Sequence, residues 1–268
     1  GDDVLYGHDG DDQLQGHDGN DAMYGSSGAE VLYGHAGDDT LGCGTGADYM
    51  DGGAGVDTIS FVSAAAGVAV MLNTGGGVGA HLGEADGDTF VGIENINGSA
   101  YSDYLVGDGI NNVITAGAGD DALLGNGGND TLYGGDGDDT LQGGLGADAL
   151  VGGAGSDTVS YVSAAGGVAV MLDTGGAVGA HLGEADGDTF VDIENINGSA
   201  YSDYLSGDNG ANVMNAGAGN DTMIGRGGND TLLGFAGDDV LYGHDGDDQL
   251  QGHDGNDAMY GSSGAEVL

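Results

Sequence analysis

Acidic residues recur at a fixed interval along this chain, and their spacing is the first feature that could do chemistry. Within three stretches an Asp or Glu returns every nine residues, next to glycines. Carboxylates are hard oxygen ligands, and calcium takes about six to eight oxygens with flexible geometry, whereas magnesium requires a tighter octahedron. We therefore predict that multiple Ca2+ ions are bound. The predicted ligands are Asp12, Asp21, Glu30, Asp39, Asp48, Asp57, Asp103, Asp121, Asp130, Asp139, Asp148, Asp157, Asp203, Asp221, Asp230, Asp239, Asp248 and Asp257.

The acids belong to a nine-residue unit, GGxGxDxUx, in which U is a large aliphatic residue. Two consecutive examples are GHDGDDQLQ and GHDGNDAMY, which start at Gly7. Glycines at positions one, two and four permit positive φ and close backbone approach, so the first six residues can form a turn. The last three are predicted to form a short strand with position eight inward and positions seven and nine outward. The predicted core is one aliphatic residue per strand, such as Leu41 or Leu132.

This unit resembles the nonapeptide of the RTX (repeats-in-toxin) calcium-binding family, and about seven-tenths of the chain follows it. The resemblance implies an all-β fold, a right-handed parallel β-roll or β-solenoid, in which two nonapeptides make one coil. Acids eighteen residues apart then share an ion. The implied pairs are Asp12 with Glu30, Glu30 with Asp48, Asp21 with Asp39, Asp39 with Asp57, Asp121 with Asp139, Asp139 with Asp157, Asp130 with Asp148, Asp221 with Asp239, Asp239 with Asp257, and Asp230 with Asp248.

Some units depart from the pattern. Asn112 and Asn212 replace the acid, and Glu30 brings a longer side chain, so we expect weaker or altered sites there. Tyr101 and Tyr201 stand where the fourth-position glycine belongs, which makes those turns non-standard.

Two near-identical segments interrupt the nonapeptides. Each contains an alternating apolar run, such as Val68, Val70 and Leu72, followed by an acidic loop with Glu84, Asp86 and Asp88. The loop is interpreted either as an additional calcium site or as a solvated loop. We expect one continuous solenoid divided into repeat blocks at residues 1–60, 98–160 and 198–268 and interrupting segments at residues 61–97 and 161–197.

Composition excludes several classes of partner. The chain has 268 residues, 45 Asp plus Glu, one Arg and no Lys, for a formal charge of −44. Nucleic-acid binding requires basic patches, so nucleic acid is excluded, and no apolar run is long enough for membrane insertion. The single cysteine, Cys43, rules out an intramolecular disulfide and is interpreted as incidental. No GxSxG-type nucleophile motif is present, and we predict that the chain is not an enzyme.

Residues 1–32 are identical to residues 237–268, which is expected of a recently duplicated, longer array. The leading hypothesis is therefore a secreted or cell-surface structural protein, such as an adhesin, surface-layer or fibre segment that stiffens on calcium binding and self-associates. The alternative is a calcium-dependent secretion and folding module of a secreted RTX enzyme. Millimolar calcium outside cells favours folding there, and the RTX resemblance implies type I secretion.

Outward side chains offer further possibilities. Tyr6 and Tyr24 are eighteen residues apart, as are His17 and His35, so each pair is expected to stack. The tyrosines could support fibre bundling or contact with a glycan or another surface ligand, or they could simply cover the sheet. The histidines could bind copper or zinc, or they could be exposed turn residues.

Overall fold

The computed structural model describes residues 1–72, 82–172, 182–265 and 267. Within these ranges the helices are two short 3-10 turns, η1 (Gly83–Ala85) and η2 (Gly183–Ala185), and neither is long and apolar enough to cross a membrane. The remaining regular structure is β-strand. The chain divides into two compact units, Gly1–Gly137 and Asp138–Leu268, which are described separately.

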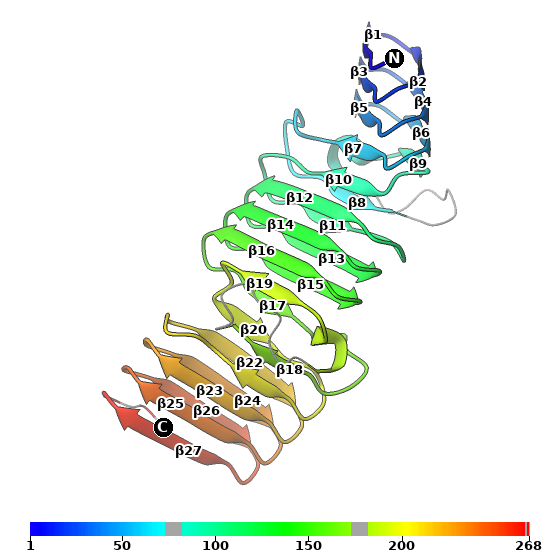
Figure 1. The fold of residues 1–268 in the computed structure, drawn as a ribbon. Coiled ribbons are helices and arrows are strands. Elements are labelled where there is room, and N and C mark those ends of the chain that lie inside the picture. The colour runs from blue at the N-terminus through cyan, green and yellow to red at the C-terminus, as the bar shows by residue number, and fades with distance from the viewer. Residues whose placement is uncertain (73–81, 173–181, 266, 268) are drawn as a thin grey trace. The chain divides into compact units, whose positions relative to one another are not determined.

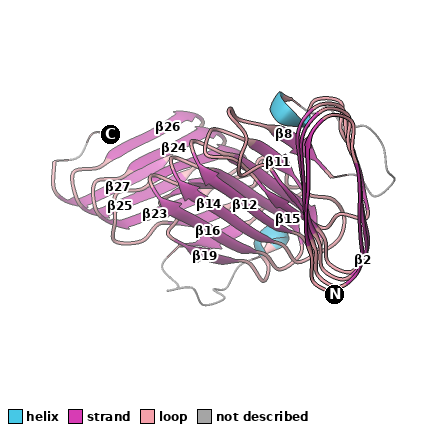
Figure 2. Cartoon of the chain, turned by 90° about the horizontal axis from the view of Figure 1, so that it is seen from above, coloured by secondary structure: helices cyan, strands magenta, loops and turns pink. Residues whose placement is uncertain are grey.

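The first unit contains three stacks of parallel strands (Figure 1). The first stack is β1 (Val4–Asp9), β3 (Ala22–Ser27), β5 (Thr40–Thr45), β7 (Thr58–Ser60), β10 (Asn95–Asn97), β12 (Val113–Ala118) and β14 (Thr131–Asp136). The second is β2 (Gln13–Asp18), β4 (Val31–Ala36), β6 (Tyr49–Ala54) and β9 (Thr89–Val91), and the third is β8 (Ala69–Met71), β11 (Tyr104–Val106) and β13 (Ala122–Gly127). Seen from above, the coils of the N-terminal block superpose into a flattened ring with a sheet on each long side (Figure 2).

The second unit is built in the same way. Its stacks are β16 (Ala149–Ala154) with β19 (Thr189–Val191); β15 (Thr140–Leu145), β17 (Thr158–Ser160), β20 (Asn195–Asn197), β22 (Val213–Ala218), β24 (Thr231–Ala236) and β26 (Gln249–Asp254); and β18 (Ala169–Met171), β21 (Tyr204–Ser206), β23 (Thr222–Gly227), β25 (Val240–Asp245) and β27 (Ala258–Ser263).

Residues eighteen apart are neighbours in the regular coils. Leu5 pairs with Met23, Leu14 with Leu32, and Leu232 with Leu250, all in parallel register. Position eight therefore forms an inward column, and its side chains are almost completely buried, as predicted, except for Leu5 and Met259 in the terminal coils, which are half-buried. The fold class inferred from the sequence, an all-β parallel solenoid, is confirmed.

The strands are longer than expected. We predicted three residues per strand, but strands of the regular coils have six and continue into positions one to three of the next nonapeptide. The reason is that position two adopts a left-handed conformation, with φ of 75° at His17 and 80° at Arg226, and this bend brings positions two and three back into register. The pairing of His17 with His35 is an example.

Each interruption forms an enlarged coil. The chain leaves β7, places β8 beside β11 of the following coil, and then returns to place β9 beside β6 of the preceding coil. It next places β10 beside β7, so the first stack continues through the interruption. The second copy repeats this course with β17, β18, β19 and β20. The segments are thus longer rungs of the solenoid, and β8 and η1 fill the detour.

Candidate metal sites

The regularly spaced acids lie inside the coils, at the ends of the turns that lead into the strands. Sixteen of the eighteen predicted ligands are buried, each no more than 5% exposed, while Asp12 and Asp257 are half-buried. Fully buried carboxylates are rare unless their charge is compensated. Their burial follows from the strand alternation, because position six and position eight point to the same side.

Asp39 illustrates how successive acids are arranged. Its Oδ1 accepts a hydrogen bond from the backbone N–H of Asp21 at 2.8 Å, and its own N–H donates to Oδ1 of Asp57 at 2.8 Å. The same bond joins the predicted pairs Glu30 with Asp48, Asp139 with Asp157, Asp221 with Asp239, Asp230 with Asp248, and Asp239 with Asp257. The structure therefore brings these pairs together in files that run along each unit.

The other three predicted pairs are of two kinds. No such bond is described between Asp12 and Glu30, and the remaining two pairs have one acid in each unit. Asp12 lies one coil before Glu30, because the adjoining residues Gln13 and Val31 are paired. The pairs Asp121 with Asp139 and Asp130 with Asp148 span the division between the two units and stay predictions.

The second carboxylate oxygen of these acids is left without a hydrogen bond. Oδ2 is buried and has no hydrogen-bond partner in Asp21, Asp39, Asp57, Asp221, Asp230, Asp239 and Asp248. A buried polar atom without a partner costs about 1–3 kcal/mol, and more if it is charged. The files therefore require either protonation or a cation to offset this cost.

The glycine at position one of each unit lets this oxygen pack closely against the backbone. The point at which Gly34 would carry a Cβ lies 2.2 Å from Asp39 Oδ2 and 2.5 Å from the carbonyl oxygen of Gly52 in the next coil. The corresponding point at Gly225 lies 2.2 Å from Asp230 Oδ2 and 2.8 Å from the Gly243 carbonyl oxygen. Any side chain would clash with both oxygens, so glycine allows a carboxylate oxygen and a carbonyl oxygen of neighbouring coils to lie close together. Both are hard oxygen ligands of the kind that calcium takes.

The raised pKa values of the buried acids also favour a bound cation. Burial, and to a smaller extent neighbouring carboxylates, raise the pKa of Asp57, Asp221 and Asp230 to about 6. The pKa of Glu30 is raised to about 7 by burial and by Asp48, Asp12 and Asp11. A cation bound among these groups would remove both causes, because it compensates the charge and replaces the lost hydration.

The ligands available are mostly backbone oxygens. In the described ranges no three His, Cys, Asp or Glu side chains converge on one point. A site between turns would therefore combine one or two carboxylates with carbonyl groups. Such an all-oxygen set suits a hard cation and does not suit metals that prefer thiolate or imidazole.

The departures noted in the sequence have visible consequences. In the turn with Tyr101, Asp103 is held locally, since Ser99 donates its N–H to Oδ2 at 2.6 Å and its hydroxyl to Oδ1 at 2.8 Å. Ser199 binds Asp203 in the same way. Oδ2 of both acids thus has a protein donor, whereas Oδ2 of a regular acid such as Asp39 has no hydrogen-bond partner. Cys43 occupies position one, where the other units have Gly or Ala, and its buried side chain fills the space beside Asp48.

The interruptions supply four acids to these files that we did not predict individually. Asp88 and Asp188 accept the N–H of Asp48 and Asp148 at 2.9 Å, and Glu94 and Glu194 accept the N–H of Asp57 and Asp157 at 2.8 Å. A signal was present, because DTFV at residues 88–91 and ENIN at residues 94–97 reproduce the second half of the nonapeptide. The first half is missing there, which is why Asp88 and Asp188 were interpreted as part of an acidic loop and Glu94 and Glu194 were not considered as ligands.

A second, exposed ladder runs beside the buried one. The side chain of position five accepts the N–H of position five in the following coil, as in Asp38 to Asn20 at 2.9 Å and Val56 to Asp38 at 2.9 Å. This ladder points in the opposite direction along the solenoid to the buried carboxylates. Its acceptor side chains are exposed, and its hydrogen bonds satisfy backbone N–H groups at the outer edge of the turns.

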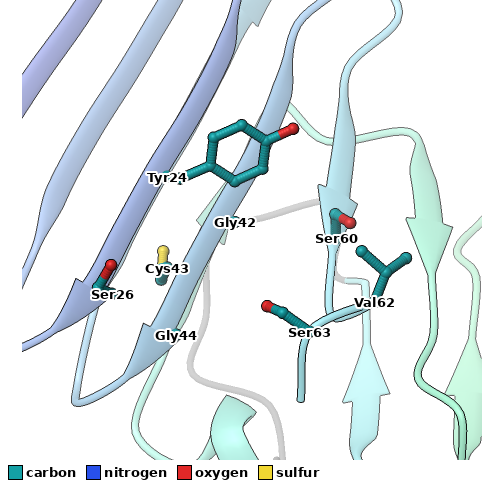
Figure 3. Close-up of a pocket in the computed structure, with 8 residues that line it drawn as sticks. All are labelled: Tyr24, Ser26, Gly42, Cys43, Gly44, Ser60, Val62 and Ser63. Carbon is teal, nitrogen blue, oxygen red and sulfur yellow. The ribbon is translucent and has the colours of Figure 1, made fainter. Parts of the chain in front are cut away.

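The outward aromatic residues stack as predicted. The rings of His17 and His35 are 5.4 Å apart and nearly parallel, and those of Tyr6 and Tyr24 are also 5.4 Å apart. Next to Tyr24 the outward column is broken by Gly42, which leaves a pocket of about 70 Å³ (Figure 3). Besides Tyr24, its lining includes Ser26, Ser60 and Ser63.

Parallel coils of eighteen residues, with carboxylates buried under glycine turns, define a β-solenoid with sites suited to calcium. The chain belongs to the RTX calcium-binding nonapeptide repeat family, which it matches over residues 1–29, 24–59, 88–123, 97–132, 124–159, 197–232 and 233–265. One of these matches starts at Asp88. A search among curated proteins found no match to the chain. The repeats are structural calcium-binding units, and proteins that carry them are typically secreted.

Proposed function

We propose that this chain is a segment of an extracellular structural protein, an adhesin, surface-layer or fibre scaffold, whose coils form and stiffen when several calcium ions bind between the turns. The ligands are the eighteen repeat acids predicted from the sequence together with carbonyl oxygens of the glycine turns. The observation that carries this proposal is the file of buried carboxylates whose second oxygen has no hydrogen-bond partner and packs against a position-one glycine.

If folding depends on calcium, it also depends on whether the chain is inside or outside the cell. If each ion is present at about ten times its dissociation constant, each site adds about 1.4 kcal/mol to stability. The core of one residue per strand is thin, so these contributions decide whether the coils form. Free calcium is millimolar outside cells and far lower in the cytosol, which favours folding after export.

Repetition favours a scaffold over the alternative, a secretion and folding module of an RTX enzyme. The identity of residues 1–32 and 237–268 indicates selection for length, since solenoid stability is roughly the sum of contributions from neighbouring coils. Self-association into fibres or arrays fits the same role. Sedimentation of the calcium-loaded chain over a range of concentrations tests it, and a monomer throughout contradicts it.

The calcium proposal is tested by circular dichroism of the whole chain in chelator and in millimolar calcium, with magnesium as control. We expect β structure to appear with calcium only. A chain that is equally β-rich in all three conditions overturns the proposal. Asp39→Asn is expected to raise the calcium concentration needed for folding several-fold, while Asp38→Asn, which changes the adjacent exposed acid, leaves it nearly unchanged. Equal effects of the two variants contradict the assignment of the buried acids as ligands.

A second candidate function, saccharide binding, is favoured by the pocket at Gly42. A Cβ at Gly42 would approach Cδ1 of Tyr24 to 3.4 Å, so the ring borders the pocket, while Ser26, Ser60 and Ser63 supply hydroxyl groups. An aromatic wall with hydroxyl groups around it suits the apolar face and the hydroxyls of a sugar ring. Titration of the calcium-loaded chain with a panel of methyl glycosides tests this. Tyr24→Ala should abolish binding and Tyr33→Ala, in the neighbouring sheet, should not.

A further inference from the structure

The two interruptions place an identical acid in an identical backbone setting. Residues 82–91 and 182–191 have the same sequence, and Asp88 and Asp188 are both fully buried. Each accepts the N–H of the acid in the preceding coil through Oδ1, at 2.9 Å in both cases. Each is followed by a threonine that donates its N–H to the same preceding residue at 2.8 Å. These bonds hold β9 and β19 against the coils before them.

The surroundings of the second carboxylate oxygen differ. Tyr161, which is 1% exposed, donates its hydroxyl to Oδ2 of Asp188 at 2.7 Å. The residue at the same place in the first copy is Phe61, which has no hydroxyl group, and Oδ2 of Asp88 is buried without a hydrogen-bond partner. One oxygen atom therefore separates a satisfied carboxylate from an unsatisfied one.

Among the described residues, the charged groups that act on Asp88 are Asp48 and Asp86, and both are negative. Burial is the main cause that raises the pKa of both Asp88 and Asp188 to about 7, and the difference between them is the Tyr161 hydroxyl, which binds Asp188 and favours its ionised form. A buried, ionised carboxylate without compensation is strongly unfavourable, so Asp88 requires a cation wherever it is ionised.

We propose that the Tyr161 hydroxyl takes the place of a cation at Asp188, so that the second interruption docks on its preceding coil without an ion of its own, whereas the first docks only when a hard divalent cation such as calcium neutralises Asp88. The inference rests on the proposed calcium-dependent folding and assigns different ion requirements to two joints of the same scaffold. The second interruption is thus the joint that forms first as calcium rises.

Hydrogen exchange measured by mass spectrometry on the whole chain, over a calcium titration, tests this. Peptides that contain Thr89 or Thr189 and extend past residue 92 or 192 differ in mass, because residue 92 is Gly and residue 192 is Asp, and they report the docking of β9 and β19. In the unmodified chain we expect the peptide with Thr189 to become protected at a calcium concentration lower by about tenfold or more, the ratio that one charge-assisted hydrogen bond supplies. Coincident protection of the two peptides overturns the proposal.

Exchanging the two side chains provides the matched variants. Tyr161→Phe should move the midpoint of the Thr189 peptide up to that of the Thr89 peptide, and Phe61→Tyr should move the Thr89 midpoint down. Calorimetry with calcium should show one additional ion for Tyr161→Phe and one fewer for Phe61→Tyr. Phe61→Tyr adds a bond, so it keeps the test decisive if Tyr161→Phe folds poorly. Unchanged midpoints and ion numbers in Phe61→Tyr contradict the inference.

Failure of the underlying calcium proposal gives a different result. In that case neither peptide responds to calcium, in the unmodified chain or in the variants. If only the inference fails, both peptides respond to calcium, and they do so together.

Discussion

The two interruptions are near copies that differ in how they compensate the same buried charges. Over residues 52–106 and 152–206 they differ at eight of 55 positions. The differences are Val56 and Ser156, Ile59 and Val159, Phe61 and Tyr161, Ala66 and Gly166, Asn73 and Asp173, Gly77 and Ala177, Gly92 and Asp192, and Val106 and Ser206. The pairs at 73 and 77 lie outside the described residues.

The difference between Phe61 and Tyr161 has a counterpart one coil earlier. Cys43 precedes the first interruption at position one, and Gly143 precedes the second. The first copy thus combines a side chain beside Asp48 with an unsatisfied Asp88, whereas the second combines a glycine, against which Asp148 packs, with a bonded Asp188. The shared residues set the backbone course, and a single side chain, Phe61 or Tyr161, decides whether Oδ2 of the interruption acid has a hydrogen-bond donor.

Acidification in metal-free buffer should have the largest effect, and it should act on both copies alike. Asp88 and Asp188 each have a pKa raised to about 7, and regular acids such as Asp57 have a pKa of about 6. A carboxyl pKa that is raised on folding stabilises the fold below its unfolded value, near pH 4, and this contribution is lost as the pH rises through about 6–7. We therefore expect β structure without calcium to increase as the pH falls from about 8 to about 5.

Circular dichroism in metal-free buffer measures this change, and the same titration in millimolar calcium is the control. With calcium the dependence should reverse, because protons compete with the ion for the carboxylates. A loss of β structure on acidification without calcium would contradict the pKa shifts of the acid files.

Neutralising the two interruption acids should separate the copies. Asp88→Asn removes an uncompensated buried charge and keeps an oxygen for the Asp48 N–H, so it should stabilise the chain by about 1–3 kcal/mol at limiting calcium. Asp188→Asn leaves a single oxygen for two donors, the Asp148 N–H and the Tyr161 hydroxyl, and should destabilise by about 1 kcal/mol. Urea unfolding at about pH 8, where the acids are ionised, measures the free energy of unfolding of both variants. Changes of the same sign in the two variants would contradict the difference between the copies.

Exchanging Cys43 and Gly143 should redistribute ion sites. Cys43→Gly removes the side chain beside Asp48, so Asp48 can pack as the regular acids do, and it should add one bound calcium, worth about 1.4 kcal/mol at ten times its dissociation constant. Without calcium the same variant should lose about 1 kcal/mol, because glycine is more flexible in the unfolded chain and buries less. Gly143→Cys would place a Cβ 2.2 Å from Asp148 Oδ2, so this carboxylate must move, and the variant should lose one ion. Calorimetric ion counts that do not move in opposite directions would refute the proposed role of Asp48 and Asp148 as ligands.

The smallest expected effect concerns the turn before Glu194. Asp192 has φ of 50°, a left-handed conformation that Gly92 adopts in the first copy with φ of 57°. Asp192 also raises the pKa of Glu194 and Asp157 through its charge. Asp192→Gly should therefore stabilise the second copy by about 0.5–1 kcal/mol, and Gly92→Asp should destabilise the first by a similar amount. Thermal unfolding of the two variants in calcium measures these changes in stability. Unchanged unfolding midpoints would contradict the prediction.

The regular coils could be predicted from the sequence because their pattern is local and repeated. The position of Leu41 in its nonapeptide fixes its burial, and the eighteen-residue coil fixes the contact between Asp21 and Asp39. The predicted strand length of three residues was wrong. The pattern does not reveal that the left-handed conformation at His17 and its equivalents returns the following residues to the parallel register.

The interruptions could be predicted only in part. The alternating run around Val70 indicated a strand, and β8 occupies it. The order of pairing could not be foreseen, since β8 joins the following coil and β9 the preceding one through contacts between residues distant in sequence. The bond between Tyr161 and Asp188, 27 residues apart, depends on that order, and nothing local in the sequence marks it.

The detour of β8 and β9 also has a mechanical consequence. One face of the solenoid changes stacks at each interruption, because β9 ends one stack and β8 begins another. Continuity of the backbone ladder then depends on the three residue pairs between β7 and β10, such as Ile59 with Ile96, and on their equivalents between β17 and β20. The ladders on either side, from β5 to β7 and from β10 to β12, have two residue pairs each. Under tension along the stacking direction we expect the ladders around each interruption to yield before the longer ladders of the regular coils. A chain of this kind would extend in discrete steps under load and dissipate mechanical work at each step. The spacing of the interruptions would set the size of the steps.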